Sequence, residues 1–324
     1  MAEIISIPDH PDDAMKRSIS LLSNGQPIAI PTETVYGLAA DATNPDAITS
    51  IYTTKGRPQF NPLICHMADM DMAQRYGEFD TISKKLAEHF WPGALTIVVP
   101  LKPDSGIHKL ATAGLETVGI RVPKGFAAKL IAQFDRPLAA PSANSSGKIS
   151  PTTAEHVQAD LGKKIELILD NGACDVGVES TIVKSDGKSV YLLRPGGVSA
   201  DAIEAVIGKK LVRLDGAQDN KIEAPGMLTS HYAPNAQMRL NAATVSSNET
   251  LITFGNAEIE GYSNAQAVFN LSPKGDLAEA AHNLFDMLIE ADKTNAEMIV
   301  VAPIPNEGLG EAINDRLTRA AAPR

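Results

Sequence analysis

The chain has 324 residues, of which 44% are apolar and 21% charged, and its formal net charge is −10. This composition is typical of a globular protein with two domains and excludes collagen-like, coiled-coil and largely disordered chains. No stretch approaches the roughly 20 uncharged apolar residues of a membrane span. Two cysteines cannot form a disulfide framework or a four-thiolate zinc site, and the acidic start lacks a signal-peptide pattern. We therefore expect a cytoplasmic protein with no metal site of its own and no contact with a membrane.

The distribution of charge favours a small anionic ligand over nucleic acid. A net charge of −10 argues against a protein that coats a polyanion. Residues 55–194, however, carry 17 basic and 15 acidic side chains, so the centre of the chain is slightly positive within an acidic protein. Such a centre suits an anionic small molecule.

The first part of the chain alternates predicted helices and strands. A helix is expected to begin at Pro11, with acidic residues in its first turn, and to end before Gly25. Asn44 is expected to cap a second helix that begins at Pro45 and runs toward Tyr52. Short apolar runs bounded by Pro or Gly predict strands, and periodic runs between them predict further helices. The predicted strands are 27–31, 62–67, 94–100, 118–123, 137–141 and 165–170, and the further helices lie near 70–76, 82–90, 125–134 and 152–161.

A hairpin and a capped helix close this part of the chain. Asp186 and Gly187 supply the turn of the hairpin, between two runs of alternating hydrophobicity. A helix over 199–208 follows, with a Ser cap and a Gly stop. The interleaved strands and helices predict an open α/β domain over residues 1–208.

The remaining residues predict a long connection and a second domain. Residues 209–236 show little periodicity, and long connections in compact proteins are usually functional or disordered. Strands at 251–255, 267–271 and 298–304 then surround an amphipathic helix over 277–292. This order of strand, helix and strand predicts a small α/β domain over residues 237–324.

Four polar segments lie beside predicted strands, and none contains a standard nucleotide-binding motif. Taken alone, each has an ordinary structural interpretation, as a turn, a solvated basic loop or a Ser/Gly linker. Lys55 and Arg57 flank a glycine, so both cations and the backbone amide can face one anion. A loop rich in hydroxyl groups can hold phosphate or ribose oxygens. The segments are PTETVYGLAADA (31–42), KGRPQFNPLICH (55–66), APSANSSGKISPT (140–152) and DVGVESTI (175–182), the last followed by Arg194.

In combination, these segments resemble the threonylcarbamoyl-AMP synthases, a YrdC-like family of tRNA-modification enzymes. The resemblance covers residues 10–200 and extends to the connection, where PGMLTSHYAP (225–234) is similar to the linker of the long, two-domain form. The resemblance implies a YrdC-like twisted open sheet with helices, whose concave face holds a nucleotide. It also implies a smaller, Rossmann-like α/β C-terminal domain.

The resemblance implies a nucleotidyltransferase that makes L-threonylcarbamoyladenylate from L-threonine, bicarbonate or CO2, and ATP, releasing pyrophosphate. Mg²⁺ would arrive with the triphosphate. A partner threonylcarbamoyl transferase would pass the product to the adenosine beside the anticodon, so tRNA would be involved only indirectly. The nucleophile is a carbamate oxygen that is already anionic. Preorganised cations and amide donors, rather than a strong base, would therefore supply most of the catalysis.

Three groups of residues take roles by resemblance. The cluster around the reacting phosphates is Lys55, Arg57, Ser142 and Asn144. The ATP-binding residues are Arg57, Asn61, Thr117, Ala140, Ser142, Ser150, Arg194 and His231. The L-threonine-binding residues are Thr34, His66, Arg121 and Ser180, with Arg121 expected to bind the carboxylate.

Several of these assignments leave an alternative open. Thr117 and Ser180 could be hydroxyls at strand edges, and His66 could be a core histidine with its hydrogen bonds satisfied. Glu33 and Glu179 are left out of the catalytic set, because acids beside a triphosphate repel it unless they bind Mg²⁺. The connection over 209–236 is expected to cover the mouth of the pocket as a lid and to touch ligand through His231.

Two other classes of function are less consistent with the sequence than the synthase. A non-catalytic module that binds double-stranded RNA or tRNA on its concave face is disfavoured by the net charge and by the lack of a basic stripe. A carbamoyltransferase is the second alternative, because YrdC-like domains also occur in hydrogenase-maturation proteins. Those proteins carry zinc-binding cysteine pairs, which this chain lacks.

Overall fold

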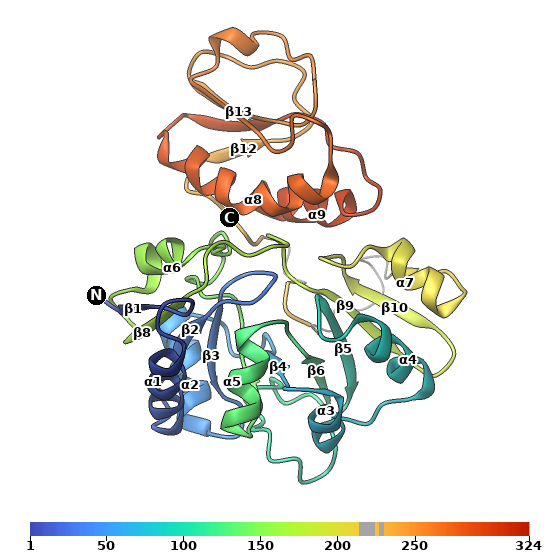
Figure 1. Cartoon of the computed structure of the whole chain (residues 1–324). Helices are drawn as coiled ribbons and strands as arrows, with labels where there is room; N and C mark the ends of the chain where they lie inside the picture. Colours follow the sequence, from blue (N-terminus) through green and yellow to red (C-terminus); the bar gives the residue numbers. More distant parts are fainter. Residues whose placement is uncertain (214–223, 227–229, 324) are drawn as a thin grey trace.

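The computed structural model describes residues 1–213, 224–226 and 230–323, and it contains two sheets with their own helices. Figure 1 shows the larger body below and the smaller one, built from residues after the connection, above it. The connection expected to be a lid lies partly outside the described residues, at 214–223 and 227–229. Within the described part of the chain, no helix is long and apolar enough to cross a bilayer.

The larger sheet is mixed and twisted, and most of its strands are short. Strand β2, for example, pairs in parallel with one neighbour and antiparallel with the other. Short apolar strands that are buried on both faces, such as β2, are typical of a sheet covered by helices. In sheet order, its described strands are β1 (Glu3–Ser6), β8 (Leu167–Asp170), β2 (Ile28–Ile30), β3 (Gly37–Asp41), β7 (Leu138–Ala139), β4 (Ile64–His66), β6 (Thr117–Arg121), β5 (Leu95–Pro100), β9 (Thr181–Ser185), β10 (Val190–Arg194) and β11 (Val212–Arg213).

The helices of the larger body begin and end at residues that the sequence singles out. The Asn44 side chain accepts hydrogen bonds from the amides of Asp46 and Ala47, which confirms the predicted cap. Ser199 accepts one from Ala202, and Gly208 ends that helix in the left-handed region. The helices are α1 (Pro11–Ser23), α2 (Pro45–Lys55), α3 (Met70–Tyr76), α4 (Thr81–Phe90), α5 (Phe126–Phe134), α6 (Ala154–Leu161) and α7 (Ala200–Ile207).

The smaller body is a parallel sheet with helices. Figure 1 shows its two helices, α8 and α9, on the side that faces the larger body. The apolar face predicted for the helix over 277–292 is buried, as Ala281, Leu284 and Leu288 show. In sheet order its strands are β12 (Gln237–Arg239), β15 (Met298–Val301), β13 (Glu249–Thr253) and β14 (Ala267–Asn270); its helices are α8 (Leu277–Lys293), α9 (Gly310–Ala320) and the 3₁₀ turn η1 (Tyr262–Asn264).

One apolar cluster contains residues of both bodies. Val35, Ile149 and Val178 of the larger body belong to the same buried cluster as Leu284 and Phe285 on α8. Because these side chains are nearly fully buried, the two bodies share part of one core. This shared core fixes α8 and α9 beside the ends of the large sheet.

Candidate active site

A narrow cavity lies where several strands of the large sheet end and the connection passes over them. Its volume is about 50 Å³, which is room for a few water molecules. Pro225, Gly226, His231 and Tyr232, all described residues of the connection, line it together with residues of the sheet. Nine of the residues predicted from the sequence also line it: Thr34, Arg57, His66, Arg121, Ala140, Ser142, Ser180, Arg194 and His231.

Two buried guanidinium groups give one part of the cavity a positive charge. Arg57 donates from Nε to the Asn61 carbonyl at 3.2 Å and from Nη2 to the Pro62 carbonyl at 2.9 Å. Arg194 donates from Nη2 to the Ser180 carbonyl at 2.8 Å. Burial lowers the pKa of Arg57 to about 10, so the group stays charged at neutral pH. Both arginines are held by neutral carbonyl groups in these contacts, which leaves their charge available to an anion.

A second part of the cavity is built around Arg121. Its Nη2 lies 2.8 Å from Glu33 Oε1, its Nη1 donates to Thr34 Oγ1 at 2.9 Å, and its Nε donates to the Gly93 carbonyl at 3.1 Å. Burial acts to raise the pKa of Glu33, but the Arg121 charge and the hydrogen bonds from the Lys124 amide and from Arg121 together lower it. Arg121 therefore reaches the cavity already paired with a carboxylate, which the sequence did not predict.

Two histidines face the cavity in their neutral form. Burial lowers the pKa of His66 to about 3 and that of His231 to about 3. Within the described residues, Nδ1 of each ring is buried without a hydrogen-bond partner. A buried polar atom without a partner carries a desolvation cost that a bound ligand can remove. Both rings are therefore placed to accept or donate one hydrogen bond to a ligand.

Lys55 and Asn144 lie behind the cavity, in contact with the loop after β7. Lys55 Nζ donates to the Ser142 carbonyl at 2.6 Å and also to the Asn144 carbonyl. Asn144 Nδ2 donates to the Lys148 carbonyl at 2.8 Å. Burial lowers the pKa of Lys55, and neither residue lines the cavity. In this structure the two side chains hold the loop that carries Ser142, one of the lining residues.

Gly56 allows this arrangement by ending α2 with a positive φ of 61°. The left-handed conformation favours glycine because it has no Cβ. The reversal places Lys55 at the last turn of the helix, against the loop, and turns Arg57 into the cavity. Lys55 therefore holds the loop, and Arg57, two residues later, lines the cavity.

The other predicted residues reach the cavity less directly. The Asn61 carbonyl accepts from Arg57, and Thr117 lines a smaller space beside Pro225. Ser150 donates to Glu179 Oε1 at 2.5 Å, and Glu179 itself lines the cavity. None of these three predicted residues is part of the cavity lining.

The C-terminal body contributes contacts that the sequence did not predict. Arg316 on α9 donates from Nε to Glu179 Oε2 at 2.8 Å, and its guanidinium lies 5.1 Å from the centre of the Tyr232 ring. Tyr232 also stacks on Phe285 of α8, with ring centres 5.5 Å apart. These contacts connect α8 and α9 to the end of the connection that borders the cavity.

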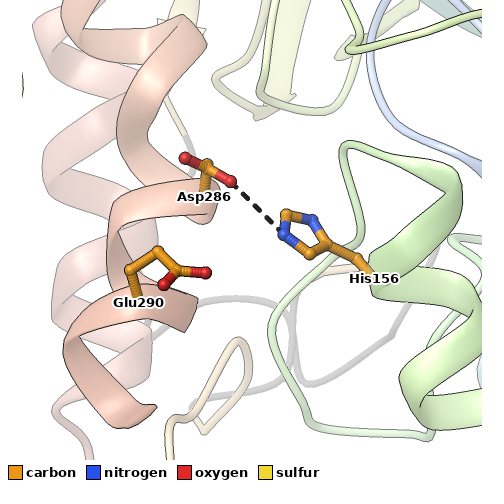
Figure 2. Close-up of side chains that lie close together, drawn as sticks. All are labelled: His156, Asp286 and Glu290. Carbon is orange, nitrogen blue, oxygen red and sulfur yellow. Dashed lines mark ion pairs between the residues drawn. The ribbon is translucent and has the colours of Figure 1, made fainter. Parts of the chain in front are cut away.

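A polar contact between α6 and α8 lies outside the cavity (Figure 2). His156 Nε2 is 3.3 Å from Asp286 Oδ1, and Glu290 lies one helical turn further along α8. Ligand atoms of the three residues lie within 4.8 Å of one another, as the donors of a divalent metal would. Glu290 is already paired with Lys293 at 2.6 Å, however. We therefore interpret the contact as a polar contact between the two bodies rather than as a metal site.

Comparison with known proteins places this chain in one family. The family described as Telomere recombination, with Sua5, YciO and YrdC, matches residues 20–196. The family described as Threonylcarbamoyl-AMP synthase, C-terminal domain, matches residues 198–322. Together they cover the two bodies of the structure, so the chain is a two-domain protein of the Sua5 type.

Relatives of full length carry the same two parts. The threonylcarbamoyl-AMP synthase of Bacillus subtilis is 40% identical over 97% of this chain and 94% of its own length. That of Pyrococcus abyssi is 36% identical over 100% and 99%. The chain belongs to the threonylcarbamoyl-AMP synthase family, and the resemblance inferred from its motifs is confirmed.

Solved structures agree with the fold. The crystal structure of Pyrococcus abyssi Sua5 complexed with L-threonine has a TM-score of 0.85 at 36% identity, covering 95% of this chain and 94% of that one. Escherichia coli YciO, at 19% identity and a TM-score of 0.54, covers 60% of this chain and shares the fold. The predicted YrdC-like sheet and small α/β domain are confirmed.

Proposed function

We propose that this protein is an enzyme that makes L-threonylcarbamoyladenylate from L-threonine, bicarbonate or CO2, and ATP, with release of pyrophosphate. The observation that carries the proposal is the cavity, which brings Arg57 and Arg194 together with Thr34, His66 and Arg121. Full-length relatives named threonylcarbamoyl-AMP synthase, one of them crystallised with L-threonine, support the same activity. They also favour an enzyme over a module that only binds RNA.

The chemical step that we propose is a nucleotidyl transfer. A carbamate oxygen of threonylcarbamate attacks the α-phosphorus of ATP, an O–P bond forms, and the bond to the β-phosphate oxygen breaks. Pyrophosphate leaves with that electron pair. The charges of Arg57 and Arg194 would offset the approach of one anion to another. A neutral His66 or His231 fits this chemistry, because no proton has to leave the carbamate oxygen.

The loop after β7 would supply further donors for the phosphates. Lys55 and Asn144 hold this loop from behind, so we assign them to positioning rather than to direct contact with phosphate. Ser142, which lines the cavity, and the amide groups of the loop are the donors that a triphosphate could meet. In this assignment Arg57 of the Lys-x-Arg motif contacts the substrate, and Lys55 positions the loop.

The Arg121 corner is proposed to bind L-threonine. A guanidinium has five N–H donors, and the contacts with Glu33, Thr34 and Gly93 leave donors for the amino-acid carboxylate. Glu33 would then face the ammonium or carbamate nitrogen of the substrate, and His66 Nδ1 could bind a polar group of the side chain. The corner therefore offers one donor or acceptor to each polar group of threonine.

Mg²⁺ is proposed to enter with ATP and to be held mainly by phosphate oxygens. Glu33 and Glu179 are already engaged, Glu33 by Arg121 and Glu179 by Ser150 and Arg316. They therefore do not fit a protein-built Mg²⁺ cage. The connection residues Gly226 and His231 are proposed to cover bound ATP and exclude water from the product.

The product would be consumed by a separate threonylcarbamoyl transferase acting on the adenosine next to the anticodon. The test is pyrophosphate release from ATP by the full chain, with and without L-threonine and bicarbonate. We expect release only when both are present, together with threonylcarbamoyladenylate detected by mass spectrometry. Release that is independent of threonine would contradict the proposed function.

A further inference from the structure

A chain of buried contacts runs from the C-terminal body to the wall of the cavity. Arg316 on α9 is fully buried, and its Nε donates to Glu179 Oε2 at 2.8 Å. The other carboxylate oxygen of Glu179 accepts from Ser150 Oγ at 2.5 Å. Arg316 Nη1 donates to the Pro195 carbonyl at 2.9 Å, after β10, and to Asp315 Oδ2 at 2.6 Å, so the guanidinium also contacts a second carboxylate, on α9 itself.

The carboxylate of Glu179, at the centre of these contacts, lies where it would repel an anionic substrate. Glu179 is 7% exposed and lines the cavity together with Arg57 and Arg194. An ionised carboxylate in such a place is costly unless a cation contacts it, and it opposes the binding of another anion. The C-terminal body supplies that cation.

The other charged groups around Glu179 do not replace Arg316. Arg194 and Lys55 act on it electrostatically, but Arg194 donates to the Ser180 carbonyl and Lys55 to the loop after β7. His231 is neutral, because burial lowers its pKa to about 3. Burial acts to raise the pKa of Glu179, but the charges of Arg316 and Arg194 and the hydrogen bonds from Ser150 and Arg316 together lower it to about 2.

We propose that Arg316 is a positioning residue for ATP binding, which neutralises Glu179 and orients its contact with Ser150 so that the carboxylate does not repel the triphosphate. The proposal rests on the proposed function, because it concerns the ATP part of the same cavity. It gives the C-terminal body a direct electrostatic role in the reaction. The charge balance of the active site is then divided between the two bodies.

The same arginine supports the connection. Its guanidinium lies 5.1 Å from the centre of the Tyr232 ring, and Tyr232 follows His231, which lines the cavity. A loss of Arg316 could therefore act through the connection as well as through Glu179. The experiment has to separate the two routes.

The test compares Arg316→Met, Arg316→Lys and the double variant Glu179→Gln/Arg316→Met in the full chain. In Arg316→Met, Glu179 is left buried without its cation, so its pKa rises. We expect KM for ATP at pH 8 to increase about tenfold, the effect of one pKa unit of interaction, while KM for threonine stays within about threefold. The increase should shrink as the pH is lowered toward the range in which Glu179 becomes protonated and uncharged.

The double variant is the decisive control. It lacks both charges, so KM for ATP should return to within about threefold of the unmodified protein at every pH tested. The titration of ATP itself is common to all the proteins and cancels in this comparison. An effect through Tyr232, or through Asp315, which also loses its contact with Arg316, would persist in the double variant, whereas an effect through Glu179 would vanish.

Arg316→Lys keeps the charge and should bind ATP without the pH dependence of Arg316→Met. If Arg316→Met does not fold, the lysine and double variants still decide: a KM for ATP raised tenfold in the double variant overturns the proposal. An unchanged KM for ATP in a folded Arg316→Met also overturns it. Binding of a non-hydrolysable ATP analogue, measured by calorimetry, tests the same charges even if pyrophosphate release should contradict the proposed function.

Discussion

His66 on β4 and Arg121 on β6 are direct partners in a parallel pair of strands, and both side chains line the same cavity. Thr34 reaches this corner from the turn before β3 through its 2.9 Å hydrogen bond with Arg121. The register of two short strands and this hydrogen bond therefore bring three separate segments of the chain to one place. The selectivity of the cavity for its amino-acid substrate can therefore be tested at this corner.

Serine should be a poor substitute for threonine in pyrophosphate release. It offers the same hydroxyl group but lacks the methyl group, and a difference of about one methylene in a fitted pocket changes kcat/KM about 10- to 200-fold. The measurement is kcat/KM for each amino acid at saturating ATP and bicarbonate. Equal values for serine and threonine would contradict a pocket shaped for threonine.

Arg57→Ala should lower kcat/KM by about 100-fold or more, because it removes a preorganised cation beside the reacting phosphates. Its contacts with the Asn61 and Pro62 carbonyls are also lost, so the melting temperature should fall slightly. Arg75→Ala is a matched control, since Arg75 is half exposed and paired with Asp135 on the surface. Unchanged kinetics in a folded Arg57→Ala would remove this residue from the active site.

Lys55→Met should loosen the loop after β7 and lower turnover through that loop. The ammonium donates to the Ser142 carbonyl at 2.6 Å, and the Ser146 amide donates to the Lys55 carbonyl at 2.8 Å. Hydrogen exchange over 142–148 should therefore become faster. Lys85→Met, at an exposed position of α4, should leave both exchange and turnover unchanged. Loss of turnover without faster exchange would instead indicate direct contact of Lys55 with substrate.

The stability of the protein should fall as the pH is lowered from about 6.5 to 4.5. Burial lowers the pKa of His66 and of His231 from 6.5 to about 3, so in this range the unfolded chain binds protons that the folded chain does not. At pH 5, each histidine therefore lowers the free energy of unfolding by up to about 2 kcal/mol relative to its value above pH 6.5. The measurement is urea unfolding at several pH values. His66→Asn should reduce the pH dependence and His10→Asn, at an exposed position, should not; equal slopes for the two variants would contradict this assignment.

Much of the fold could be predicted from local sequence signals. The helix that begins at Pro11, the cap at Asn44 and the hairpin turn at Asp186 all rely on contacts between neighbouring residues. Strand β3, with the sequence GLAAD, was missed because it has none of the β-branched or aromatic residues that favour strands. Helix α9 was missed because its buried Arg316 interrupts the apolar pattern.

The candidate site could be predicted in part, through motifs rather than through geometry. The motifs identified the residues around the cavity but could not separate Arg57, which lines it, from Lys55, which holds the loop behind it. That separation depends on the backbone reversal at Gly56. Arg316 could not be identified, because its contact with Glu179 joins residues that are distant in the sequence and lie in different bodies.

The shared ion pair has a consequence for how the two bodies can be recombined. A catalytic body that is cut away from α9, or grafted onto an unrelated partner, retains the carboxylate of Glu179 at the wall of the cavity and loses the cation that contacts it. A neutral residue at position 179, as in Glu179→Gln, would remove this burden from an autonomous catalytic body. Residues 179 and 316 should therefore be exchanged together. A chimera that exchanges only one of them has an unbalanced charge at the wall of its active site.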